Sequence, residues 1–343
     1  MRIERFINRL QTVDSVSGVE AIPTIPFRPH EPIPATGAIV TGQPASESEG
    51  ALARTLGVRE LAASIITITI GGGVFLLPAA AAEGLGAAAW LAYVVCALVF
   101  VLIAICFAEA GSRVQTSGGP YAYVGAAFGP FWGYLSGVLG LIFATLAHAA
   151  VAAGFTQAAN ALVPGVGSGI TRTVVLLFVF VFFTAINLRG VKQGARMVEI
   201  GTVAKLVPLV LFGLVGLFAV KGTNIAWPGM PSGAALARTS MMMMFAFFGV
   251  ETALLPSGEV RDPARTVPRA IFLAIGGVTL LYLAVQQSAQ GILGPELVNF
   301  KDAPLAAVAE RGFGRSAGLL LMAGAAISML MHTPGMLLAM PRS

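Results

Sequence analysis

Eight long apolar runs constrain this chain more than any other feature of its sequence. About 20 apolar residues suffice for a helix to cross the hydrocarbon core of a bilayer. Backbone N–H and C=O groups surrounded by lipid must bond within their own segment, so we expect the runs to be helices. The sequence therefore predicts an all-α integral membrane protein with about eight transmembrane helices. The runs cover residues 61–82, 87–108, 132–163, 173–188, 200–220, 239–257, 270–293 and 316–340.

The composition agrees with a chain that lies mostly in lipid. Charged residues make up 11% of the chain, whereas a soluble domain carries about 25%. The 41 glycines are typical of helices that pack closely in a membrane bundle. The formal net charge of +5 comes from lysines and arginines that stand singly between the apolar runs. We therefore expect these charges to orient the chain in the bilayer and expect no nucleic-acid partner.

The first part of the chain has a different character. Residues 1–55 are polar and rich in proline, and they contain no apolar run that could span a membrane or serve as a signal-peptide core. This composition predicts a disordered tail. A start of translation assigned too early is the alternative for part of it.

The loops between the runs differ in their content of lysine and arginine. The excess lies before the first run and after the second, fourth and sixth runs. Because cytoplasmic loops carry such an excess, we expect a multi-pass protein of the plasma (inner) membrane with a cytoplasmic N-terminus, so that the tail is cytoplasmic as well. The residues on this side are Arg54, Arg59, Arg113, Arg189, Lys192, Arg196, Arg261, Arg265 and Arg269, together with Arg342 after the eighth run.

Two runs contain residues that break helices. The first run holds the consecutive glycines 71–73 followed by Pro78, and the sixth holds Gly249 followed by Pro256. Each glycine costs a helix roughly 1 kcal/mol relative to alanine. Secondary transporters bind substrates at discontinuous helices in matching positions of two halves, so this pattern points to a substrate site. The alternative is that the glycines only let neighbouring helices approach closely.

Ionisable residues inside the apolar runs are a second functional signal. Lys205 and Glu251 are expensive in lipid, and either could couple proton movement to transport. The alternatives are that Lys205 extends toward the membrane surface and that Glu251 anchors a broken helix through hydrogen bonds. We expect His148 and His332 to make single interhelical hydrogen bonds, and we expect the methionines 241–244 to pack, because adjacent residues point around the whole helix.

Five motifs resemble those of the amino acid–polyamine–organocation (APC) superfamily of permeases. They are the runs 70–75 (IGGGVF), 107–113 (FAEAGSR), 187–194 (NLRGVKQG), 245–251 (FAFFGVE) and 259–269 (EVRDPARTVPR), in the order of the family. The resemblance covers the chain beyond its tail. Each motif alone is unspecific, but the ordered set is highly specific.

The resemblance implies an inverted-repeat bundle in which the first and sixth helices are broken. We expect a permease domain at 56–343, with a first repeat at about 59–222 and a partial second repeat at about 235–343. Family members have more spans than the eight found here, and the chain ends inside the motif that closes the eighth span. We therefore expect a truncated permease that lacks the C-terminal helices.

The resemblance also implies a binding site between the two breaks. An amino acid's carboxylate would meet backbone N–H groups of the first break, and its amine would meet carbonyls of the sixth helix, where Phe245 would act as a gate. Lys205 aligns with a lysine that takes the place of sodium in several members. We therefore expect no bound sodium and no other cofactor, with Lys205 and Glu251 as coupling residues. The expected substrate-binding residues are Ile70, Gly71, Gly72, Gly73, Phe245, Ala246, Phe247 and Gly249.

The function we expect is secondary active transport of amino acids or related amines by alternating access, proton-coupled or by exchange. Phe247 and Phe248 near the break favour a neutral or apolar amino acid over a polyamine. No nucleophile–base pair, zinc-ligand spacing or nucleotide motif is present in the sequence, so we expect no enzyme and no metal site. The alternative is a transport-incompetent remnant or a membrane interaction subunit; a channel is less favoured, since no ring of charges is present. The expected partners are a small-molecule substrate and the bilayer, and the oligomeric state stays open.

Overall fold

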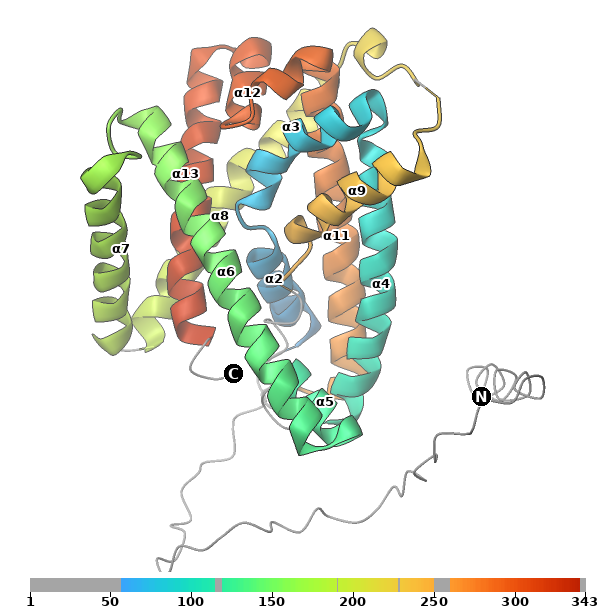
Figure 1. Cartoon of the computed structure of the whole chain (residues 1–343), viewed down its shortest axis with the longest axis vertical. Helices are drawn as coiled ribbons and strands as arrows, with labels where there is room; N and C mark the ends of the chain where they lie inside the picture. The colour runs from blue at the N-terminus through green and yellow to red at the C-terminus, as the bar shows by residue number, and fades with distance from the viewer. Residues whose placement is uncertain (1–56, 115–118, 190, 228, 250–259, 340–343) are drawn as a thin grey trace, which may run out of the picture. The chain divides into compact units, whose positions relative to one another are not determined.

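The computed structural model describes residues 57–114, 119–189, 191–227, 229–249 and 260–339. All regular elements in these ranges are helices (Figure 1). The predicted tail at 1–55 lies outside the described residues. The α-helices are α2 (Val58–Thr69), α3 (Gly73–Leu85), α4 (Trp90–Arg113), α5 (Pro120–Phe128), α6 (Pro130–Leu162), α7 (Gly169–Arg189), α8 (Val191–Gly216), α9 (Gly233–Met243), α11 (Pro263–Leu293), α12 (Pro304–Phe313) and α13 (Arg315–Ala339). The short 3-10 helices are η1 (Gly86–Ala88), η2 (Leu217–Ala219), η3 (Gly222–Asn224), η4 (Met244–Ala246) and η6 (Gly294–Asn299).

Seven of the eight predicted spans correspond to helices that could cross a membrane. In the described ranges six helices, namely α4, α6, α7, α8, α11 and α13, are long and apolar enough to do so. A seventh span consists of α2 and α3, which meet at a bend of 57°. The remaining predicted span, 239–257, begins in α9 and η4, and its second part lies outside the described residues. The chain is therefore an all-α, multi-span membrane protein.

Two long helices, α4 and α11, pack against each other over much of their length. α4 buries about one residue per turn along a single face, as the 3.6-residue period of a helix requires, and α11 buries a wider face. Many of these residues are small, which lets the two backbones approach closely. On α4 the buried face consists of Ala92, Tyr93, Cys96, Phe100, Ala104 and Ala108; on α11 it includes Val267, Ala270, Ala274, Val278, Tyr282, Val285 and Ala289.

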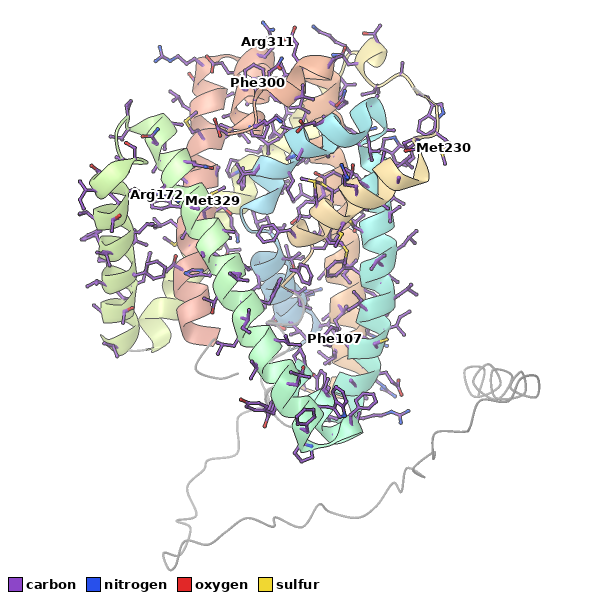
Figure 2. All side chains as sticks on the ribbon, in the orientation of Figure 1. Phe107, Arg172, Met230, Phe300, Arg311 and Met329 are labelled. Atoms are coloured by element: carbon purple, nitrogen blue, oxygen red, sulfur yellow. The ribbon has the colours of Figure 1, made fainter. Side chains whose placement is uncertain are left out.

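The helices α6 and α7 expose most of their apolar surface. Only 11% of the most apolar stretch of each is buried, against 39% in α11. Large apolar side chains project from both helices (Figure 2), including Leu139 and Phe178. Such a surface requires lipid as its solvent, because contact between this much apolar surface and water would cost free energy. α13 connects this outer pair to the rest of the fold, since it packs against α6, α7, α8 and α12.

A short helix followed by a long one occurs twice. α5 leads through Gly129 into α6, and α12 leads through Gly314 into α13. The two glycines have nearly the same conformation, with φ 93° and ψ 173° at Gly129 and φ 90° and ψ 172° at Gly314. In Figure 1, α5 and α12 lie at opposite ends of the helices. This recurrence supports the expected inverted repeat, while the repeat boundaries at 59–222 and 235–343 stay a prediction.

Candidate functional site

The first break divides the first predicted span into α2 and α3. α2 ends at Thr69, and Ile70 leaves the helical conformation with φ −77° and ψ 83°. The N–H of Gly71 donates to the carbonyl of Thr69 at 2.9 Å. The chain becomes helical again at Gly73. The triple glycine therefore ends one helix and begins another within a single span.

The second break follows α9 and lies directly against the first. η4 continues α9 to Ala246, and Gly249 has a φ of 134°, which strongly favours glycine. A Cβ atom built on Gly249 would lie 2.9 Å from the backbone nitrogen of Thr69, and one on Gly73 would lie 3.2 Å from the Cα atom of Ala246. The glycines thus allow a backbone-to-backbone contact between the two breaks. The structure brings together two segments that lie about 175 residues apart in the sequence.

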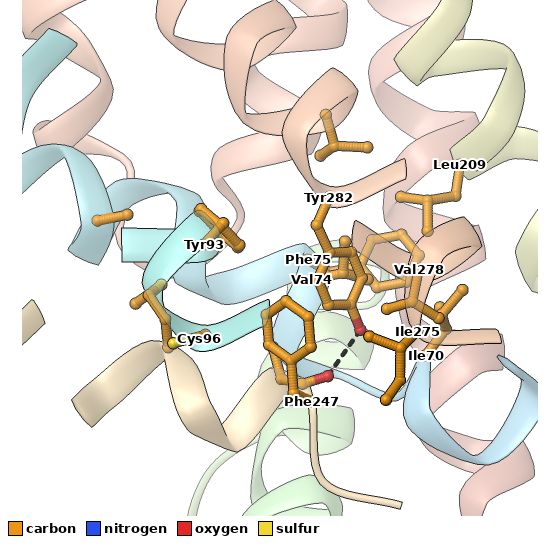
Figure 3. Packing of buried hydrophobic residues seen from close by; sticks show 14 of the residues in the cluster. Ile70, Val74, Phe75, Tyr93, Cys96, Leu209, Phe247, Ile275, Val278 and Tyr282 are labelled. Carbon is orange, nitrogen blue, oxygen red and sulfur yellow. Dashed lines mark hydrogen bonds between the residues drawn. The ribbon is translucent and has the colours of Figure 1, made fainter. Parts of the chain in front are cut away.

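Tyr282 of α11 forms a bridge between the breaks. Its hydroxyl lies 2.8 Å from the carbonyl of Ala246, to which it donates, and 3.3 Å from the carbonyl of Thr69. Figure 3 marks the shorter bond with a dashed line and shows the ring packed beside Phe247 and Val278. A buried tyrosine hydroxyl needs a polar partner. Here its single hydrogen satisfies the carbonyl of Ala246, while the carbonyl of Thr69 also accepts from the N–H of Gly71.

Lys205 of α8 holds the end of α2. Its Nζ atom donates to the carbonyl of Thr67 at 2.7 Å and to the carbonyl of Ile70 at 2.6 Å. The side chain is 5% exposed, so it points into the protein, not toward the membrane surface. The last carbonyls of a helix carry partial negative charge, and an ammonium group is favoured there. Lys205 therefore stabilises the end of α2 at the first break.

Two neighbouring residues of α13 complete the surroundings of the glycines. The hydroxyl of Ser328 donates to the carbonyl of Gly71 at 3.2 Å. The side chain of Met329 lies against Gly72, where a built Cβ atom would come within 3.1 Å of it. The space beside Gly71 differs, because a Cβ built there would have no heavy atom of the described residues within 4 Å. Among these residues, an open space therefore adjoins the first break on the side of Gly71.

The start of α3 offers hydrogen-bond donors to a ligand. Within the described ranges, no acceptor contacts the N–H groups of Gly72 and Gly73. The first N–H groups of a helix have no intrahelical acceptor, and the helix dipole adds positive potential there. This is a suitable place for an anionic group such as a carboxylate. The N–H of Gly71, by contrast, is occupied by the bond to Thr69.

Two of the remaining predicted side chains, those of Phe245 and Phe247, lie in different environments. Phe245 is 36% exposed. Phe247 is 1% exposed and stacks on Phe100 with ring centroids 5.5 Å apart, so its side chain belongs to the core and only its backbone faces the break. Glu251 lies outside the described residues.

Sequence reasoning missed Tyr282, Ser328 and the relation between His148 and His332. A polar side chain in an apolar run is a signal that could have selected Tyr282 and Ser328, because each needs a partner inside the membrane. The expectation of single interhelical hydrogen bonds was wrong for His148, whose two ring nitrogens are buried without a partner in the described part of the chain. Its ring lies 5.5 Å from that of His332.

Comparison with known proteins gives the family. A family model described as amino acid permease matches residues 56–343. The methylthioribose transporter of Bacillus subtilis (strain 168) is 28% identical over 75% of this chain and 59% of its own length. The cadaverine/lysine antiporter of Escherichia coli (strain K12) is 27% identical over 76% of this chain and 59% of its own length. The serine/threonine exchanger SteT of Bacillus subtilis (strain 168) is 26% identical over 86% of this chain and 68% of its own length. The chain thus spans about three fifths of the length of the first two relatives, and its motifs, broken helix and family match together show that it belongs to the amino acid permease family within the APC superfamily.

Proposed function

We propose that this chain belongs to a secondary active transporter, which moves amino acids or related amines across the plasma membrane by alternating access. We further propose that it is not an enzyme. The observation that carries this proposal is the contact between the break in the α2–α3 span and the end of η4, tied together by Tyr282 and held by Lys205. Interrupted helices lining one site are the usual way in which such transporters bind a substrate at mid-membrane. The three relatives compared above carry the names of a transporter, an antiporter and an exchanger.

In this proposal the substrate lies beside Gly71. Its carboxylate accepts from the N–H groups of Gly72 and Gly73 at the start of α3. Its amine donates to carbonyls at the second break, near Phe245. The apolar surroundings of that break favour a neutral or apolar side chain over a polyamine.

The ammonium of Lys205 takes the place in which a sodium ion would neutralise the end of α2. Transport is therefore independent of sodium and proceeds by exchange or with protons. The N-terminus lies on the cytoplasmic side, as the loop charges predict. Glu251 stays a proposed coupling residue on the basis of its position in the sequence.

Uptake of a radiolabelled panel into proteoliposomes tests the proposal. The panel contains neutral, acidic and basic amino acids and a polyamine, with an imposed pH gradient, with internal substrate for exchange, and with sodium replaced by choline. We expect saturable, sodium-independent uptake of a neutral amino acid. Gly72→Trp abolishes it, since the ring would displace Met329, and Gly140→Trp retains it, because the space beside Gly140 on α6 is open.

The transport-incompetent alternative makes an opposite prediction. A monodisperse, thermally stable protein that neither transports nor binds any member of the panel would overturn the proposal for this 343-residue chain. Tighter binding of the polyamine than of every neutral amino acid would overturn the substrate class alone. Loss of uptake in choline would overturn the role of Lys205 in place of sodium.

A further inference from the structure

A stripe of polar side chains runs along one buried face of α11. Tyr282, Gln286 and Gln290 follow one another at intervals of four residues, so they lie on the same face of the helix in successive turns. Their side chains are 1%, 0% and 3% exposed, respectively. Glutamine is rarely buried in proteins, and inside a membrane a polar side chain needs a partner. Tyr282 meets the two breaks, so the two glutamines are the part of the stripe that remains to be explained.

Each glutamine amide has one partner from another element. The hydroxyl of Tyr93, on α4, donates to Oε1 of Gln286 at 3.3 Å. Nε2 of Gln290 donates to the carbonyl of Asn224, in η3, at 3.4 Å. Asn224 returns a bond to α11, since its Nδ2 donates to the carbonyl of Gly291 at 2.9 Å. The two amides therefore connect α11 with α4 at one end of the pair and with η3 at the other.

The second polar atom of each amide meets no partner in the described part of the chain. These atoms are Nε2 of Gln286 and Oε1 of Gln290, and both are buried. A primary amide carries two donor hydrogens on its nitrogen and an acceptor oxygen, and leaving either atom buried and unpaired is costly. One of the two atoms is a donor and the other is an acceptor, so they require complementary partners.

The spacing of the two glutamines suits one small bridging group. Side chains four residues apart on a helix have Cβ atoms about 5–6 Å apart, and two hydrogen bonds of about 2.8 Å each through a single oxygen atom span the same distance. A water molecule can accept from Gln286 and donate to Gln290 at once, and buried waters make two to four such bonds. An ion fits less well, because a cation is repelled by the donor and an anion by the acceptor.

We propose that a water molecule is bound between Gln286 and Gln290, where it accepts from Nε2 of Gln286 and donates to Oε1 of Gln290. It completes a continuous chain of hydrogen bonds from Tyr93 of α4, across two turns of α11, to Asn224 of η3. The bound water thereby fixes the connection between α8 and α9 to the face of α11 that also holds the breaks. This site is independent of the proposed transport function.

Transfer of magnetisation from water to the glutamine side chains tests the site on the unsubstituted protein. The full chain is labelled with 15N and 13C at glutamine and valine and placed in lipid bilayers for solid-state NMR, and each side-chain amide is assigned through its own backbone signals. We expect rapid transfer to the amides of Gln286 and Gln290, although both side chains are closed to bulk solvent. Val278 is the control, because it is equally buried on the same helix and offers water no polar atom on its side chain.

Paired substitutions test whether one water joins the two amides. Gln286→Met and Gln290→Met keep an unbranched side chain but remove the amide. Each alone should lower the thermal unfolding midpoint by a few degrees. The double variant should lose less than the sum, because either single substitution already removes the shared water. Gln157→Met, at an exposed position on α6, is the matched control and should be additive with Gln286→Met.

Two results would overturn the site. One is the absence of transfer from water to either amide in the unsubstituted chain, which would mean that the amides bond each other directly or have another partner. The other is transfer to both amides with losses that add as fully as they do with Gln157→Met, which would mean separate waters and no bridge. The first result needs no variant, so misfolding cannot hide it. If a methionine variant does not fold, Gln286→Asn and Gln290→Asn, which keep a shorter amide, take its place in the second test.

Discussion

The two breaks are held in different ways. Side chains from three helices bond to carbonyls of the first break: Lys205 of α8, Tyr282 of α11 and Ser328 of α13. In the described part of the second break, Tyr282 donates to the carbonyl of Ala246, and Gly249 approaches the backbone of α2 closely. The difference indicates that the first break is fixed by charge and hydrogen bonds, whereas the second depends on the shape of a glycine.

Removal of the Lys205 ammonium should have the largest effect on the first break. Lys205→Ala leaves the carbonyls of Thr67 and Ile70 without their charged donor, and we expect a loss of about 3 kcal/mol in the free energy of unfolding. Thermal unfolding in detergent measures it. Lys205→Arg keeps the charge but changes the shape of the charged group. Its free energy of unfolding should therefore lie between those of the unsubstituted protein and of Lys205→Ala. A Lys205→Ala protein with unchanged stability and unchanged pH dependence of uptake would contradict both roles of this residue.

A methyl group at Gly249 tests the second break. Gly249→Ala puts a Cβ atom against the backbone of α2 in a conformation with φ 134°. We expect a loss of about 2 kcal/mol, since a strained backbone of this kind costs 1–3 kcal/mol. Gly276→Ala is the matched control, because the space beside Gly276 on α11 is open. It should be neutral or stabilise the helix by up to about 1 kcal/mol. Equal effects of the two variants would mean that the close contact at Gly249 is unimportant.

Tyr282→Phe removes the group that the two breaks share. The ring packing against Phe247 and Tyr93 remains, so the loss should be confined to the hydroxyl and amount to about 1 kcal/mol. Tyr134→Phe on the exposed surface of α6 is the control and should leave the unfolding midpoint unchanged. If the hydroxyl couples the breaks, Tyr282→Phe and Gly249→Ala should not be additive in the double variant.

Ser328→Ala should have the smallest effect. A single hydrogen bond of 3.2 Å to Gly71 is lost, and interhelical hydrogen bonds in membranes average about 0.6 kcal/mol. The unfolding midpoint checks this value. A loss above that caused by Tyr282→Phe would show that α13 contributes more to the first break than α11 does.

The fold was largely predictable because long apolar runs, broken by glycine and proline, are local signals. The break at glycines 71–73 could be located for that reason, whereas the place of Lys205 inside a run left its extension toward the membrane surface open as an alternative. The contacts that complete the site are not local. Tyr282 meets Thr69 across 213 residues and Ser328 meets Gly71 across 257, and no periodicity within one helix indicates which distant helix lies beside it.

The same limit applies to Phe247, His148 and His332, whose surroundings depend on contacts between helices that are distant in the sequence. Phe247 is next to a break in sequence, yet its side chain points into the core because η4 continues the turn of α9. His148 and His332 each look like an isolated polar residue in an apolar helix. Only the packing of α6 on α13 brings their rings together.

The 57° bend at the first break has a mechanical consequence. α3 packs mainly against α9, η6 and α12 and also contacts α11, whereas α2 packs mainly against α11. The two halves of this span therefore differ in most of their neighbours and are joined by a pivot at the glycines. α2 has 12 residues and is therefore a lever arm of about 18 Å. A rotation of about 10° at the pivot would carry the far end of α2 through roughly 3 Å, about the diameter of a water molecule, while α3 stayed in place.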